Sequence, residues 1–150
     1  MWKQPAAGGP PIQVTRNGGD SACESPDGKW LYFSSPESGG IWRMPVSKSD
    51  RPRVFAGEEL VIGQGYEVEH ESWTVTSEEI FFVDRGPNRR SHTIRTYHIA
   101  TKQTRPILAL ADLPTDKSMG PLSVSPDLRW LLYSQLDRSG SNVMVAENIP

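Results

Sequence analysis

A short phrase occurs twice in this chain, and its repetition constrains the fold more than any other feature. Residues 25–35 read SPDGKWLYFSS and residues 125–135 read SPDLRWLLYSQ. In each copy a Pro fixes φ at the first corner of a turn and an Asp side chain favours the second corner. The run that follows is apolar at both alternating positions, as in a strand covered on both faces. The phrase therefore predicts a tight turn leading into a buried central strand, and the turn accounts for Asp27 and Asp127 without a catalytic or metal role.

The two copies differ at their fourth residue, where Leu128 stands in place of Gly28. Glycine adopts the left-handed backbone conformation freely, whereas another residue there costs about 1 kcal/mol. Either Leu128 carries this cost, or the second turn has a different geometry. The unit between the two copies, at residues 76–79, lacks the motif altogether.

Strand-like runs recur along the chain in the same order, and helix signals are nearly absent. Runs of β-branched and aromatic residues end at clusters of Gly, Pro, Asp and Ser. Matching positions lie 40 residues apart (Trp2 and Trp42), 54 apart (Arg51 and Arg105) or, over two units, 100 apart (Ser25 and Ser125). A period of this size, built from four short strands, is typical of β-propeller blades. The expected strands are residues 1–5, 10–15, 21–24, 29–34, 41–46, 52–56, 69–75, 80–84, 93–99, 105–110, 122–124, 129–135 and 142–147.

The predicted fold is all-β, with antiparallel four-stranded blades forming an incomplete β-propeller of about three blades. Residues 1–19 would supply the last two strands of one blade and residues 119–150 three strands of a final blade. Residues 20–57 and 66–111 would form complete blades between them. Closed propellers need about four to eight blades. We therefore expect open edge strands and self-association of the chain through them.

Composition argues against several classes of function. The net charge is −2 and the pI about 5.9, so no broad basic field is present to bind nucleic acid. The single cysteine, Cys23, excludes an internal disulfide and a cysteine-pair metal site, and it does not fix the compartment. No apolar run approaches the ~20 residues that span a membrane. Nucleophile-elbow, P-loop and dinucleotide-binding motifs are absent from the sequence, which predicts neither an enzyme nor a cofactor.

Candidate binding residues come from the expected geometry of a propeller. Its innermost strands line a central channel, and the loops that lead into them form a rim suited to binding. These loops are residues 17–22, 66–73 and 116–120, and their polar side chains are Asp20, Glu69, His70, Glu71 and Lys117. In a regular strand, Glu69 and Glu71 share one face and His70 points the other way, a poor arrangement for a metal. The rim residues are therefore predicted to bind a protein or ligand; the alternative is that they are solvated loop residues.

The repeat resembles a known family. SPDGKWLYFSSPESGGIWRMPV, residues 25–46, closely resembles the repeat of TolB-type, WD-like β-propellers, and residues 1–19 are similar to the end of another such blade. The closing stretch, residues 121–150, is similar to the C-terminal end of large bacterial proteins. In those proteins a TolB-like propeller follows a winged-helix DNA-binding domain or a protein kinase domain. The resemblance implies that the chain is the C-terminal part of such a protein.

The resemblance implies a non-enzymatic module that binds protein or a small ligand, with a sensory or regulatory role in a bacterial signalling or transcriptional regulatory protein. One alternative is the substrate-gating propeller of a prolyl-oligopeptidase-type peptidase whose catalytic domain is absent here. Another is a periplasmic TolB-like scaffold. The partner stays unidentified, and both a cytoplasmic and a periplasmic location stay open.

Overall fold

The computed structural model describes residues 1–15, 18–46, 57–87, 91–110, 119–137 and 140–147. In the last of its sheets, side chains are described up to Ser134 and at Val145. The described residues form thirteen β-strands and no helix. The all-β prediction is thus confirmed.

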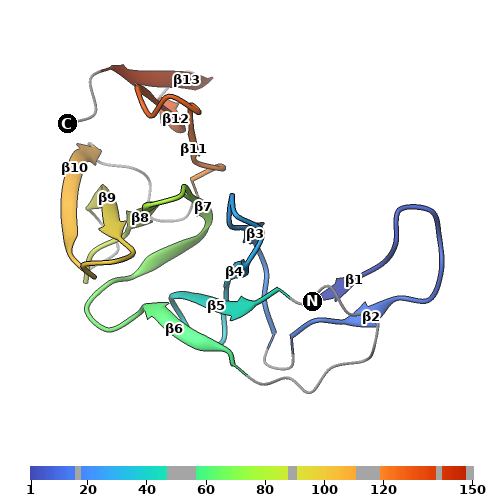
Figure 1. Ribbon diagram of the computed structural model, residues 1–150. Helices are drawn as coiled ribbons and strands as arrows, with labels where there is room; N and C mark the ends of the chain where they lie inside the picture. The colour runs from blue at the N-terminus through green and yellow to red at the C-terminus, as the bar shows by residue number, and fades with distance from the viewer. Residues whose placement is uncertain (16–17, 47–56, 88–90, 111–118, 138–139, 148–150) are drawn as a thin grey trace.

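Four antiparallel sheets follow one another along the chain (Figure 1). The first is a hairpin of β1 (Trp2–Lys3) and β2 (Ile12–Gln13). The second contains β3 (Ala22–Glu24), β4 (Trp30–Ser34), β5 (Ile41–Pro45) and β6 (Glu59–Ile62). The third contains β7 (Val68–Val75), β8 (Glu79–Asp84), β9 (His92–His98) and β10 (Thr104–Leu110). The last contains β11 (Ser123–Val124), β12 (Trp130–Asp137) and β13 (Gly140–Glu147).

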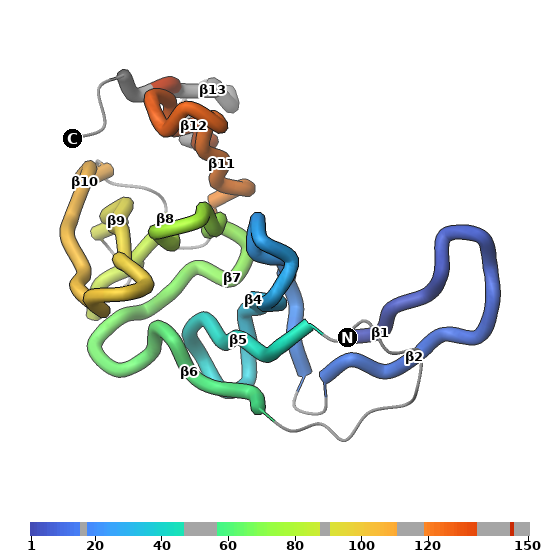
Figure 2. The backbone as a smooth tube through the Cα atoms, viewed as in Figure 1, coloured from blue at the N-terminus to red at the C-terminus, as the bar shows by residue number. Residues whose placement is uncertain are grey.

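Within each sheet, strands that are consecutive in the sequence are neighbours in space, as in the blades of a propeller. The tube in Figure 2 shows the sheets following one another around an arc, with the β1–β2 hairpin at one end and β11–β13 at the other. Two sheets have four strands, and the last has three among the described residues. This is the predicted architecture of an incomplete β-propeller.

The fourth strand of the second sheet differs in position from the expected one. Residues 52–56 lie outside the described residues, and the strand that pairs with β5 is Glu59–Ile62. A bulge between Ile41 and Trp42 adjusts the register of this pair. Just before the bulge, Gly40 has φ 76°, and a Cβ atom there would lie 2.0 Å from the carbonyl oxygen of Ile62. Glycine is therefore required where β6 approaches β5. The division of the chain at residues 19–20, 57–66 and 111–119 remains a prediction.

Both copies of the repeated phrase form the same turn. In the first copy the Gly28 amide donates to the Ser25 carbonyl (2.8 Å), and the Ser25 amide donates to the Trp30 carbonyl (2.8 Å). The Asp27 carboxylate accepts hydrogen bonds from the Ser25 hydroxyl (2.7 Å) and the Lys29 amide (3.1 Å). The equivalent bonds recur in the second copy with Ser125, Asp127 and Leu128. Asp27 and Asp127 thus act as turn residues, as predicted.

The backbone at Leu128 decides between the two possibilities raised by its sequence. Its φ is 59°, close to the 68° of Gly28. The second turn therefore keeps the geometry of the first, and Leu128 adopts the left-handed conformation at a cost of about 1 kcal/mol.

We call the face of a sheet that is turned toward the next sheet in the sequence its forward face, and the opposite one its backward face.

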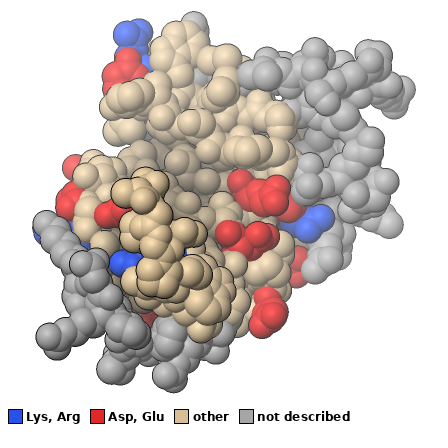
Figure 3. Space-filling model, turned by 90° about the vertical axis from the view of Figure 1, so that its right-hand side faces the viewer, with Lys and Arg blue, Asp and Glu red and all other residues tan. Residues whose placement is uncertain are grey.

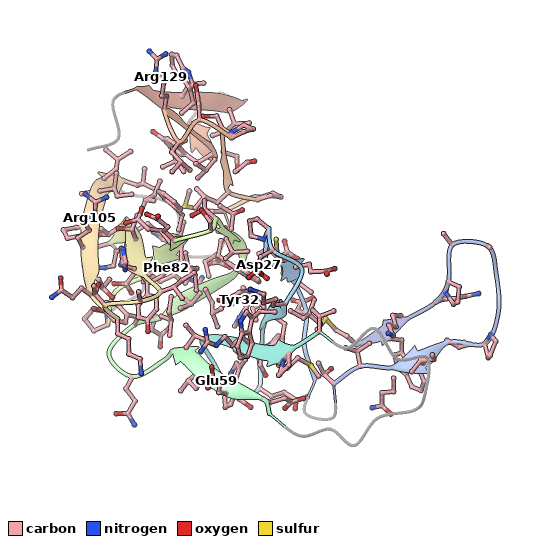
Figure 4. The ribbon with its side chains drawn as sticks, in the orientation of Figure 1. Asp27, Tyr32, Glu59, Phe82, Arg105 and Arg129 are labelled. Atoms are coloured by element: carbon pink, nitrogen blue, oxygen red, sulfur yellow. The ribbon has the colours of Figure 1, made fainter. Side chains whose placement is uncertain are left out.

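Two hydrophobic clusters join consecutive sheets, one between the second and third sheets and one between the third and last sheets. Figure 4 shows Tyr32 of β4 and Phe82 of β8 in the interior between two of the sheets. The first cluster contains Tyr32, Ile41, Ile62, Val68, Trp73, Val75, Ile80, Phe82 and Tyr97. The second contains Phe81, Val83, Ile94, Leu110, Met119, Leu122, Leu131 and Tyr133. Consecutive residues of β8 thus belong to different clusters, which explains why its sequence is apolar without alternation.

Candidate functional site

The first strands of the three larger sheets meet at the centre of the arrangement (Figure 1), where β7 contacts both β3 and β11. Serine hydroxyls tie these sheets together. The Ser34 hydroxyl donates to the carbonyl of His70 (2.7 Å), and the Ser72 hydroxyl lies 2.8 Å from the carbonyl oxygens of Met119 and Gly120. Neutral hydrogen bonds of this kind contribute about 0.5–1.5 kcal/mol each. They hold the inner strands in a fixed relation, which is the frame of the candidate site.

A large irregularity in β7 determines where the predicted site residues point. Val68 pairs with Asp84, but Trp73 pairs with Phe82, so five steps along β7 correspond to two along β8. The residues between these two pairs form a bulge, and side chains within it need not alternate between faces. Glu69 is buried, with 3% of its surface exposed, whereas Glu71 is exposed. The expectation that these two glutamates share a face is therefore wrong, because the bulge breaks the period of two.

Two of the predicted site residues line one cleft. Asp20, before β3, and Glu71, in the bulge of β7, both border a cleft of about 340 Å³. Both residues are exposed. The other lining residues are Ser21, Ala22, Cys23, Trp73, Thr74 and Pro121. The cleft thus draws its walls from the inner strands of two sheets and from the segment before β11, and its only charged lining residues among those described are two carboxylates.

Glu69, by contrast, is held by a basic neighbour. Its Oε2 atom lies 3.0 Å from Nε of Arg85, which follows β8, although the two atoms are not aligned as a hydrogen bond. A buried carboxylate is stable only when it is paired. The ion pair therefore anchors the start of β7 to the end of β8, and Glu69 is not among the residues that line the cleft.

Two histidines of the third sheet, His70 and His92, lie near this end of it, and neither lines the cleft. His70 is half-buried, and its carbonyl oxygen also accepts a hydrogen bond from the Trp73 indole (3.0 Å). His92, at the start of β9, is buried, and neither of its ring nitrogens has a hydrogen-bond partner among the described residues. Burial and then the charge of Arg85 hold the pKa of His92 below its ordinary value of 6.5. Its imidazole is therefore neutral at physiological pH.

The described part of the chain offers no group of three or more His, Cys, Asp or Glu residues placed to hold a metal ion. It also contains no helix that could cross a membrane. Figure 3 shows one side of the molecule, where acidic side chains lie near the middle and basic ones are dispersed among them. Lys117, expected at the rim, lies outside the described residues.

The cleft includes Asp20 and Glu71, which the sequence analysis names, and Ser21, Ala22 and Trp73, which lie within its expected rim stretches 17–22 and 66–73. Cys23, Thr74 and Pro121 lie outside those stretches, because nothing in the sequence around them marks a concave surface. The bulge has no sequence signal, since buried strands such as β8 are apolar at both alternating positions without a bulge. It shows only in the fold: Val68 and Trp73 pack in one cluster although a regular strand would place residues five positions apart on opposite faces.

Comparison with known proteins bears on the fold. No protein-family model matches this chain, and no curated protein sequence matches it. The crystal structure of TolB from Acinetobacter baumannii matches it with a TM-score of 0.67 and 13% sequence identity. The match covers 97% of this chain and 34% of that TolB chain. The fold is a TolB-like β-propeller. Within it, the TolB-like chain spans about a third of the length of the structure it matches, and the cleft lies among its inner strands.

Proposed function

We propose that this TolB-like chain is a binding module rather than an enzyme, and that the cleft between β3 and β7 receives its ligand. The observation that carries the proposal is the convergence of Asp20 and Glu71 on this cleft from two different sheets. Concave sites built on rigid strands with a few polar groups are typical of ligand recognition. The serine hydrogen bonds between the sheets support the proposal, since they fix the walls of the cleft before any ligand arrives.

The charge of the lining favours a ligand that carries positive charge. Two exposed carboxylates face a small opening whose remaining described lining is uncharged. Trp73, Ala22 and Pro121 supply apolar surface beside them. A protein segment or small molecule with an ammonium or guanidinium group and a short apolar stem matches this combination. The buried pair of Glu69 and Arg85 would support the strand without contacting such a ligand.

The proposal is tested with a fluorescently labelled tetralysine peptide, its binding followed by fluorescence anisotropy at low ionic strength. We expect the variants Asp20→Asn and Glu71→Gln each to weaken binding severalfold, and the double variant to weaken it about tenfold or more. Glu78→Gln is the matched control, because Glu78 is an exposed carboxylate in the turn before β8, outside the cleft. Equal binding of a tetraglutamate peptide, or an unchanged affinity in the double variant, would refute the proposal.

We further propose that the module is the sensory or regulatory C-terminal part of a bacterial signalling or transcriptional regulatory protein. The similarity of residues 121–150 to the closing stretch of such proteins supports this role. The domains encoded next to this chain in its gene distinguish the regulatory role from the alternatives. A winged-helix or kinase domain encoded upstream agrees with the proposal. A downstream hydrolase domain would indicate a peptidase propeller instead, and an upstream signal peptide a periplasmic scaffold.

A further inference from the structure

A second cleft lies where the outer strand of the second sheet meets the outer strands of the third. It has a volume of about 410 Å³ and is lined by residues of β6 and the turn after it, and by residues of β9, β10 and the turn between them. β6 and β10 are the last strands of their sheets, whereas the first cleft is bordered by the first strands, β3 and β7. Both walls of the second cleft belong to the two middle sheets of the chain, so its shape does not depend on a surface at either end of the arc.

Two tyrosine rings in this cleft are held in place by the core beneath it. Tyr97 of β9 is buried and belongs to the first hydrophobic cluster, together with Ile62 of β6. Tyr66, in the turn before β7, lies edge-on to Phe82 with ring centroids 5.6 Å apart, and the guanidinium of Arg95 lies 5.4 Å from the centre of its ring. Such contacts restrict an aromatic side chain to one orientation. The cleft therefore has aromatic walls that are fixed before a ligand binds.

Leu60 of β6 adds an exposed apolar side chain to the same cleft. Its surface is 45% exposed, although it is only two residues from the buried Ile62. A Cβ atom at Gly63, which follows β6, would lie 2.5 Å from Cδ2 of Leu60. The glycine thus leaves the room in which the leucine side chain lies against the backbone of the turn. Leu60 therefore offers apolar surface that a ligand could cover without any movement of the strand.

The charge of the second cleft is opposite to that of the first. Among its described lining residues, Lys102 is the only charged one. Lys102 is exposed in the turn between β9 and β10, where its amide donates to the carbonyl of His98 (2.8 Å). Glu59 of β6 does not line the cleft, and its carboxylate forms an ion pair with Arg43. Burial, the largest cause, raises the pKa of Tyr97 above its ordinary value of 10, so its hydroxyl is uncharged at physiological pH.

We infer that the second cleft binds a small organic carboxylate with an aromatic or aliphatic body. The carboxylate pairs with the Lys102 ammonium, and the body lies against Tyr66 and Leu60. Gln64 and Thr104 supply neutral hydrogen-bonding groups beside them. Small-molecule sites typically enclose about 300–1,000 Å³, so the cleft suits a ligand at the small end of this range. One ammonium balances the single charge of a carboxylate, whereas phosphate groups favour arginine forks or clustered backbone amides.

Binding of hydrocinnamate, a phenyl ring on a short carboxylate chain, tests the inference by saturation-transfer difference NMR at low ionic strength. The carboxylate should bind about fivefold more tightly than its neutral amide, because an exposed ion pair contributes an effect of this size. Lys102→Gln should weaken binding of the carboxylate by the same factor, and Lys102→Arg should retain it. Lys29→Gln is the matched control, because Lys29 is also an exposed turn lysine but lies outside the cleft. Circular dichroism and thermal midpoints establish that the variants fold.

The apolar wall and the first cleft give two further comparisons. Gly63→Ala should weaken binding about threefold, because its methyl group displaces the Leu60 side chain from the wall. Glu71→Gln, in the first cleft, should leave hydrocinnamate binding unchanged, so the inference stands or fails separately from the proposed function. No binding by the unsubstituted chain, equal binding of the amide, or an unchanged affinity in Lys102→Gln would overturn the inference. Tighter binding of phenyl phosphate than of hydrocinnamate would overturn the assignment to a carboxylate.

Discussion

The two copies of the repeated phrase have nearly the same sequence and the same turn but different surroundings. In the first copy, β4 is packed on its forward face by the third sheet, and Tyr32 is fully buried. In the second copy, the described side chains of β12 pack on the backward face, through Leu131 and Tyr133, and Leu132 is exposed. The sequence pattern that predicts a strand covered on both faces is thus satisfied in one copy and half satisfied in the other. Local geometry is set by the phrase itself, whereas burial is set by the neighbouring sheet.

The largest difference is expected on truncating the equivalent side chains. Tyr32→Ala should lower the free energy of unfolding by about 3–5 kcal/mol, because it removes a buried aromatic ring and leaves a cavity between two sheets. Leu132→Ala should change it by less than about 0.5 kcal/mol in dilute solution, where its face is open to water. Urea denaturation followed by circular dichroism measures both values. A comparable loss in the two variants would mean that the second copy is as well covered as the first.

Substitutions at the equivalent turn positions Gly28 and Leu128 should change the free energy of unfolding by an intermediate amount, with opposite signs. Leu128→Gly should raise the free energy of unfolding by about 1 kcal/mol, because glycine adopts positive φ without strain. Gly28→Ala should lower it by about the same amount. A Cβ atom at Gly28 would approach its nearest neighbour, Oε1 of Glu24, to 3.5 Å, an ordinary contact, so this loss is conformational rather than steric. Thermal denaturation of each variant checks the pair, and equal effects of the same sign would disprove the shared geometry.

The smallest effect concerns the two turn aspartates and depends on pH. The hydrogen bond from the Ser25 hydroxyl, followed by that from the Lys29 amide, lowers the pKa of Asp27 to about 2. The Ser125 hydroxyl and the Arg129 amide lower the pKa of Asp127 in the same way. An aspartate with a depressed pKa stabilises the folded state at pH values above about 4, its ordinary range, and this contribution is lost as the pH falls through its folded pKa.

Asp27→Asn and Asp127→Asn should therefore lower the thermal midpoint slightly at pH 5, and this loss should shrink as the pH falls toward 2. Because both aspartates are exposed and make the same local bonds, the two variants should behave alike. If the thermal midpoint depended on pH in one variant alone, the packing of the neighbouring sheet would have to influence the turn in that copy. Differential scanning calorimetry from pH 2 to pH 6 gives the comparison.

Most strands were predictable because their signals are local. Pro26 and Asp27 mark one turn, Pro126 and Asp127 another, and the apolar runs after them are long enough to define β4 and β12. Residues 52–56, expected as the fourth strand of the second sheet from their likeness to residues 105–110, lie outside the described residues. The actual strand, Glu59–Ile62, is selected by its pairing with β5 and by the room that Gly40 leaves for it. Such long-range pairing has no local signature.

The candidate site was predictable only in part, for a related reason. The loops that lead into the inner strands follow from the repeat, and this identified Asp20 and Glu71. Glu69 and Glu71 have different environments because of the bulge and because of Arg85. Arg85 is 16 residues from Glu69 in the sequence and contacts it only in the folded sheet. Whether a carboxylate faces a cleft or an arginine is decided by strand register, and register belongs to pairs of strands rather than to one segment.

The bulge in β7 separates what the scaffold must keep from what the site can vary. Val68 and Trp73 hold the strand in the sheet on either side of it, through their pairing with Asp84 and Phe82. Between these anchors Glu69, His70 and Ser72 hold the strand to its neighbours, whereas Glu71 is exposed and lines the cleft. Exchanging Glu71 therefore alters the lining of the cleft while the strands stay in place, so a new ligand can be accommodated at this position with the fold inherited intact.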